Sequence, residues 1–194
     1  MTLADYAEVT ERHAGVQRAA ATFRWTGSWH TVFLTVDQSA GLAVTDTFET
    51  DMRAHVERYR MAGHDLELDS PQFVALEIHL HVCVAADHFR SDVESELRDV
   101  LSNRDLASCR RGLFHPDNFT FGQPVYLSAI YAAAHQVPGV ELVEALTFQR
   151  LGVPDNGALA TGRLDIGRLE IARLDNDRNF AERGVLTLSL GGGK

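Results

Sequence analysis

Three residues of the types that bind metal ions lie at every second position of one apolar stretch. His79, His81 and Cys83 therefore share one face of a predicted strand, where imidazole and thiolate groups could bind zinc or a similar ion. The other face of this strand is aliphatic, which is typical of a half-buried strand with its polar side chains on the wetter side. We favour a solvated or interface face and expect no metal ion here.

A second polar pattern resembles the opening of a calcium-binding loop. Asp175, Asp177 and Asn179 have the spacing of its first ligands. Phe180, however, occupies the position that requires glycine, and Leu186 occupies that of the bidentate glutamate. We interpret this segment as a turn rich in aspartate and asparagine.

The remaining candidates for chemistry lack the surroundings that catalysis needs. Ser128 lies in a helical pattern without flanking glycines, and Asp92 and Glu96 have the i,i+4 spacing of a charged helix face. The glycines at 162–167 and 191–193 are not framed by the strand, helix and lysine of a phosphate-binding loop. We therefore predict no catalytic residue, no cofactor and no metal site, and a protein that is not an enzyme.

The composition of the chain disfavours some classes of binding partner. The 27 acidic and 18 basic residues give a net charge of -9, which disfavours nucleic acid and anionic membranes. No apolar run approaches the roughly 20 residues of a membrane span, and Cys83 and Cys109 suggest reduced thiols and not a disulfide framework. We expect assembly in the cytoplasm.

The first part of the chain reads as alternating helices and strands. A helix is predicted over 2–13, with Thr2 as its N-cap, and a hairpin over 16–25 and 29–36 around the turn Thr26-Gly27-Ser28. A second helix is predicted over 46–61, and a short strand over 64–68.

The rest of the chain is also predicted to combine helices with strands. After Pro71, where we place the domain boundary, the patterns predict a long strand over 73–84, helices over 87–101 and 124–136, and strands from Val140 onward. The helix-to-strand passage through Ala14-Gly15-Val16 is echoed at Pro138-Gly139-Val140.

The predicted fold class is α+β. We expect two small ferredoxin-like α/β sandwich units, with mostly antiparallel sheets and helices on one face. Residues 1–70 would form the first unit, and residues 71–194 would form the second with a β-rich carboxy-terminal extension.

Aromatic residues in a predicted loop suggest contact surfaces. Phe114, His115 and Phe119 lie among turn-forming residues between 114 and 124, and such a loop is either held in the core or used for docking. The sequence leaves both alternatives open. The candidate interface residues are Phe114, His115, Phe119, Asp175, Asp177 and Phe180.

Long stretches of the chain resemble a known family. Residues 59–84, 110–134 and 168–194, together with the opening 4–37, are similar to baseplate J-like assembly proteins of contractile phage tails and phage-tail-like injection systems. Members of that family are longer, so the chain resembles a carboxy-terminal region.

The resemblance implies a structural role. It implies a wedge component of a baseplate that assembles through protein-protein contacts with other wedge subunits and further copies of itself, and with hub, spike or sheath-proximal proteins, in the finished particle. Two alternatives stay open: a metal-binding enzyme that uses His79 and His81, and a general adaptor whose acidic charge would make its binding salt-sensitive.

Overall fold

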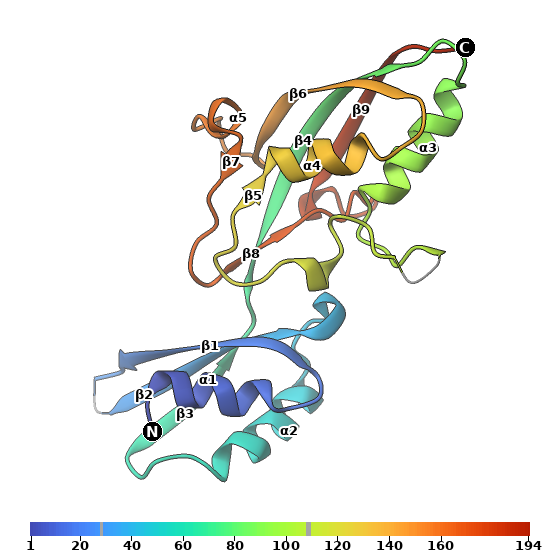
Figure 1. The fold of residues 1–194 in the computed structure, drawn as a ribbon. Coiled ribbons are helices and arrows are strands. Elements are labelled where there is room, and N and C mark those ends of the chain that lie inside the picture. Colours follow the sequence, from blue (N-terminus) through green and yellow to red (C-terminus); the bar gives the residue numbers. More distant parts are fainter. Residues whose placement is uncertain (28, 108–109) are drawn as a thin grey trace. The chain divides into compact units, whose positions relative to one another are not determined.

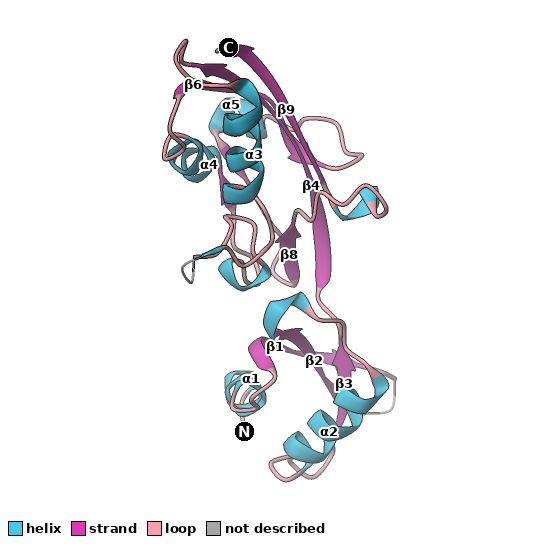
Figure 2. Ribbon diagram, turned by 90° about the vertical axis from the view of Figure 1, so that its right-hand side faces the viewer, coloured by secondary structure: helices cyan, strands magenta, loops and turns pink. Residues whose placement is uncertain are grey.

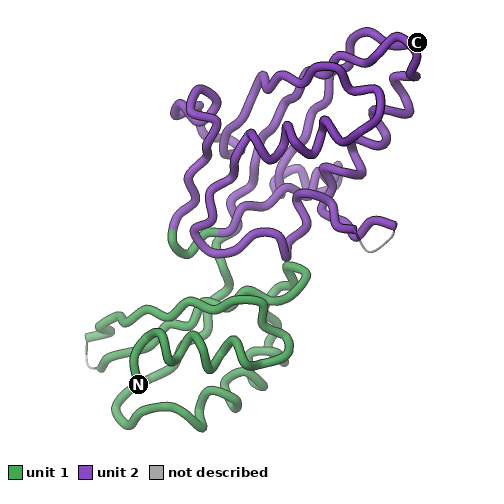
Figure 3. The backbone as a smooth tube through the Cα atoms, in the orientation of Figure 1, with its two compact units in different colours: residues 1–72, 168–170 green, residues 73–167, 171–194 purple. Residues whose placement is uncertain are grey.

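The computed structural model describes residues 1–27, 29–107 and 110–194 (Figure 1). Ser28 of the predicted turn and Cys109 lie outside the described residues, so nothing is concluded about either. The chain forms two compact units (Figure 3). Unit 1 comprises residues 1–72 and 168–170, and unit 2 comprises residues 73–167 and 171–194. The short segment 168–170, late in the chain, is thus grouped with unit 1.

Unit 1 is a three-stranded sheet with two helices. Its elements are α1 (Leu3–Glu11), β1 (Val16–Trp25), β2 (His30–Gln38), a 3-10 turn (Ser39–Gly41), α2 (Asp46–Glu57) and β3 (His64–Asp69). The strand order is β1-β2-β3. Both helices lie on one face of this sheet (Figure 2). The core between them includes Tyr6, Val32, Leu34, Met52, Val56 and Leu66.

Unit 2 is built around the long strand β4 (Gln72–Val84). The other elements are α3 (Arg90–Val100), β5 (Val125–Tyr126), α4 (Leu127–Ala134), β6 (Val140–Arg150), α5 (Ala158–Thr161), β7 (Arg163–Leu164), β8 (Glu170–Arg173) and β9 (Val185–Gly192). The main sheet has the order β6-β4-β8, with β9 also paired to β4, and β5 pairs with β7. The helices α3 and α4 cover one face of the main sheet (Figure 2).

The α+β class is confirmed, and the sheets contain more parallel pairing than we expected. Strands β1 and β2 are antiparallel, as are β4 and β6, but β2 pairs with β3 in parallel and β4 pairs with β9 in parallel. The physical reason lies in the connection: α2 carries the chain back between β2 and β3, so both strands run in the same direction.

The helix-to-strand echo has a structural counterpart in each unit. The Val16 amide donates to the His13 carbonyl at 3.0 Å where α1 passes into β1, and the Val140 amide donates to the Val137 carbonyl at 3.3 Å where α4 passes into β6. Gly139 has a φ of 87°, in the left-handed region, whereas Gly15 does not have a positive φ. A turn closed by the same kind of hydrogen bond therefore precedes a strand in both units, with a different backbone conformation at its glycine.

The predicted N-cap of α1 is confirmed, and it is part of a reciprocal cap. The Asp5 amide donates to the Thr2 Oγ1 at 3.2 Å, and the Thr2 amide donates to the Asp5 Oδ2 at 2.6 Å. This second bond is the main reason that the pKa of Asp5 lies below the ordinary value of an aspartate. Stabilisation by the Asp5 carboxylate is therefore present above that ordinary value and is lost as the pH falls through the lowered one.

We expect the substitution Asp5→Asn to lower the stability of unit 1 slightly at neutral pH, and the difference from wild type to shrink as the pH falls from the ordinary aspartate range through the lowered pKa of Asp5. Urea unfolding of both proteins between about pH 3 and pH 7 measures this difference. Asp65→Asn, a substitution of an exposed aspartate on β3, is the matched control. A constant difference across this pH range for Asp5→Asn would show that the cap does not act through its charge.

Candidate interaction surfaces

The aromatic loop of unit 2 lies in the core. Phe114, His115 and Phe119 are 3%, 5% and 8% exposed. The rings of Phe114 and Phe119 are stacked, with 5.8 Å between their centroids and 8° between their planes. Of the two alternatives that the sequence left open, burial in the core describes these three side chains in this conformation. A contact role for them stays a prediction.

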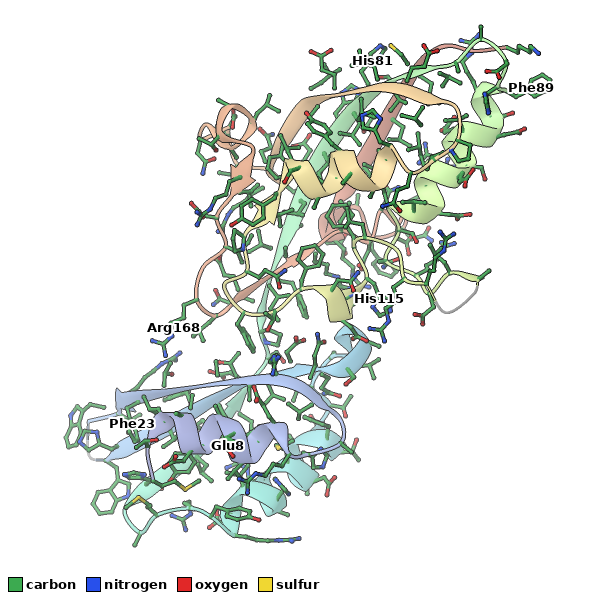
Figure 4. The ribbon with its side chains drawn as sticks, viewed as in Figure 1. Glu8, Phe23, His81, Phe89, His115 and Arg168 are labelled. Carbon is green, nitrogen blue, oxygen red and sulfur yellow. The ribbon has the colours of Figure 1, made fainter. Side chains whose placement is uncertain are left out.

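His115 is held by polar neighbours at the edge of that core (Figure 4). Its Nδ1 accepts a hydrogen bond from the Asp117 amide at 3.2 Å, and its Nε2 lies 3.5 Å from the Asp105 carboxylate. The Arg111 guanidinium lies 3.0 Å from the Asp117 carboxylate. The imidazole thus orders the 3-10 turn Pro116–Asn118 and faces little solvent.

The loop between β8 and β9 contains the other three predicted residues, of which Asp177 and Phe180 are exposed. The Asp177 carboxylate accepts a hydrogen bond from the Asn179 amide at 2.8 Å, which is the bond of an Asx turn. Phe180 is 42% exposed, and the Arg183 guanidinium lies 4.2 Å from the centre of its ring. This loop is available for contacts in a way that the Phe114 loop is not.

Asp175 is already neutralised within unit 2. The Arg173 Nε lies 2.8 Å from its carboxylate, and the Asn103 amide nitrogen donates to the same carboxylate at 3.0 Å. The hydrogen bond from the Asn103 side chain connects this loop to the segment that follows α3. The loop is therefore positioned by both the sheet and the helix.

A polar cavity opens between this loop and the turn after α3. Its volume is about 640 Å³, and we call it the arginine pocket. It is lined by Asn103, Arg104, Asp175, Asn176, Asp177, Arg178, Asn179 and Arg183. The sequence analysis singled out Asp175, Asp177 and Asn179 but not the arginines, because Arg104 lies far in sequence from Arg178 and Arg183.

The histidines of β4 bind a serine of the neighbouring strand. The His79 Nε2 lies 3.2 Å from the Ser189 hydroxyl, and the His81 Nδ1 lies 3.3 Å from the same oxygen. The Cys83 sulfur, a free thiol, lies 3.9 Å from the His81 Nε2. Figure 4 labels His81 on this strand. Within residues 1–27, 29–107 and 110–194, no group of three His, Cys, Asp or Glu side chains has a metal-binding arrangement.

Unit 1 has an exposed aromatic cluster at the tip of its hairpin, formed by Phe23, Trp25 and Trp29. These side chains are 41%, 63% and 52% exposed. The ring centroids of His30 and Trp25 lie 5.0 Å apart, and those of His64 and Phe23 lie 5.1 Å apart. Figure 4 labels Phe23. Exposed tryptophans are typical of binding surfaces. The sequence analysis overlooked them, although a tryptophan stands on each side of the predicted turn.

Among the helices of the described residues, none is long and apolar enough to cross a membrane.

The chain was compared with family models, curated proteins and solved structures. Residues 1–69 match the family model described as "Baseplate J-like central domain". The search of curated proteins found no match. A solved structure, "Cryo-EM structure of the anti-feeding prophage (AFP) baseplate, 6-fold symmetrised", matches 90% of this chain and 37% of that chain at 13% identity with a TM-score of 0.46. This chain therefore spans little more than a third of that protein's length.

Proposed function

We propose, from the premise that residues 1–69 are a baseplate J-like central domain, that the chain is a structural subunit of the baseplate of a contractile injection system or phage tail. The family match is the observation that carries this proposal. It also confirms, for this part of the chain, the resemblance to baseplate J-like proteins that the sequence suggested. The match coincides with nearly all of unit 1, which has its own sheet and its own core.

Within the baseplate we propose the role of a wedge component. Its partners would be other wedge subunits and copies of itself, with hub, spike or sheath-proximal proteins as further neighbours. The chain would fold in the cytoplasm and then become part of the particle. The exposed aromatic cluster of unit 1 and the exposed loop of unit 2 support a role in protein contacts, since aromatic and arginine side chains dominate binding surfaces.

We propose that this role is structural and not catalytic. The candidate for a metal enzyme rested on His79 and His81, and both imidazoles have the Ser189 hydroxyl as a hydrogen-bond partner. These contacts account for the two histidines as part of the pairing of β4 with β9, where residues Glu77–Val84 lie opposite Val185–Gly192.

The experiment is capture of other baseplate subunits by the tagged chain after co-expression. We expect at least one subunit to co-purify. The variant Trp25→Ala should capture less of it if the hairpin tip is the contact, because truncation of a central tryptophan typically weakens an interface at least about tenfold. Phe89→Ala, which removes a similarly exposed ring from unit 2, is the control. Capture of no baseplate subunit would overturn the proposed function.

A further inference from the structure

The arginine pocket has a surplus of positive charge on a chain whose net charge is -9. Of its two carboxylates, that of Asp175 is paired with Arg173, outside the pocket lining. Three guanidinium groups, those of Arg104, Arg178 and Arg183, are thus opposed by the single carboxylate of Asp177. The pocket therefore favours an anionic occupant.

The three arginines of the pocket are available to bind an anionic group. Within the described ranges, none of them forms an ion pair with a carboxylate, although other arginines such as Arg53 and Arg98 do so with acids of their own helices. Arg104 and Arg178 are exposed, and the Arg183 guanidinium lies 4.2 Å from the centre of the Phe180 ring. Guanidinium groups bind carboxylates in a bidentate geometry, which suits acidic side chains as the occupant.

A surface of opposite charge lies on α3 of the same unit. Asp92, Glu96 and Asp99 recur at i, i+4 and i+7, so they line one face of the helix, and all three are exposed. Asp92 accepts a hydrogen bond from the Ser91 hydroxyl at 3.1 Å. No arginine, lysine or histidine of the described chain forms an ion pair with these three residues, whereas the neighbouring Glu94 is paired with Arg98. We call this face the acidic stripe.

The stripe and the pocket adjoin along the chain, because α3 ends at Val100 and the pocket begins at Asn103. Two neighbouring patches of opposite charge on one unit are complementary to the same two patches on a second copy. A two-fold pairing of copies places the stripe of each against the pocket of the other, so every contact occurs twice.

We propose that the arginine pocket of unit 2 binds the acidic stripe of α3 from a second copy of this chain, forming a two-fold dimer. This deepens the proposed function, on which it rests for the expectation that copies of the chain meet. The contacts are exposed charge pairs, so the dimer is weak and salt-sensitive: the screening length falls from about 30 Å at 0.01 M salt to about 3 Å at 1 M.

Charge reversal tests this pairing with four proteins. The pocket variant carries Arg104→Glu and Arg178→Glu, and the stripe variant carries Glu96→Arg and Asp99→Arg. Sedimentation velocity at about 0.02 M and about 0.5 M salt measures the dimer fraction over a range of concentrations. We expect wild type to dimerise at low salt only, and each variant alone to associate at least about tenfold more weakly, because like charges then face each other.

The mixture of the two variants is the decisive sample. Their patches are again opposite in charge at both contacts, so an equimolar mixture should regain a dimer that neither variant forms alone. Arg18→Glu with Arg58→Glu, which changes the net charge as the pocket variant does but within unit 1, is the control and should dimerise as wild type does. Far-ultraviolet circular dichroism confirms that each variant is folded.

Two results would overturn this inference: a wild-type monomer at every low-salt concentration, or a mixture of variants that stays monomeric. A monomer that still captures another baseplate subunit would leave the proposed function intact. A dimer that captures none would leave the pairing intact and overturn the function.

Discussion

The substitution Phe114→Ala will lower the free energy of unfolding by about 3 to 5 kcal/mol, the range for removing a buried phenylalanine ring. The ring of Phe114 is 3% exposed and stacked on that of Phe119 within the main core of unit 2. Its removal leaves a cavity against a stacked neighbour and weakens the link between this loop and the sheet. Urea or thermal unfolding measures the loss.

Phe180→Ala is the matched control, because both phenylalanines were predicted as interface residues and only Phe180 is exposed. We expect its effect on stability to stay within about 0.5 kcal/mol, as for most surface substitutions. Any loss of partner capture should then belong to Phe180→Ala and not to a change of folding. Equal stability losses for the two variants would contradict the assignment of Phe114 to the core and Phe180 to the surface.

The substitution Gly139→Ala will destabilise unit 2 by about 3 kcal/mol or more, as expected for a left-handed residue combined with overpacking. The φ of Gly139 is 87°, and an added Cβ would lie 2.5 Å from the His88 Cγ and 2.9 Å from its Cβ. These atoms are near the base of His88, whose backbone is held by Ala85 and Lys194, so they cannot move away cheaply.

Gly15→Ala provides the comparison at the equivalent position of unit 1. Its Cβ would meet the Phe48 Cε2 at 3.2 Å, which is the end of a side chain, and no left-handed conformation is required. We expect a change of about 1 kcal/mol or less, since alanine also restricts the unfolded chain. Thermal unfolding of both variants measures the two losses of stability. Similar losses for Gly139→Ala and Gly15→Ala would contradict the expected difference between the two turns.

Local patterns were sufficient to predict most of the elements. Thr2 starts α1, the alternation of residues 16–36 forms the hairpin β1–β2, and the apolar residues of 73–84 form β4. Each of these signals lies within one segment of the chain. The helix α2 ends at Glu57, earlier than the predicted Met61, and β5 takes Val125–Tyr126 from the predicted start of α4.

What the sequence could not supply were the relations between distant segments. The parallel pairing of β2 with β3 depends on the return path through α2, and Tyr126 leaves the helix because it pairs with Arg163 of β7. Burial decides the fate of Phe114 and Phe180, which look alike in sequence. The arginine pocket needs Arg104 and Arg178 from segments more than 70 residues apart, so only the fold brings them together.

The most direct test of the central claim is the mass of the complex that the chain forms with another subunit of the same baseplate, measured by light scattering behind size-exclusion chromatography. The chain alone has a mass of 21.4 kDa. The account predicts a species of defined larger mass that contains both proteins and persists at about 0.15 M salt, where exposed charge pairs are largely screened beyond about 8 Å. Two separate peaks at every salt concentration, with each baseplate subunit tried in turn, would contradict it.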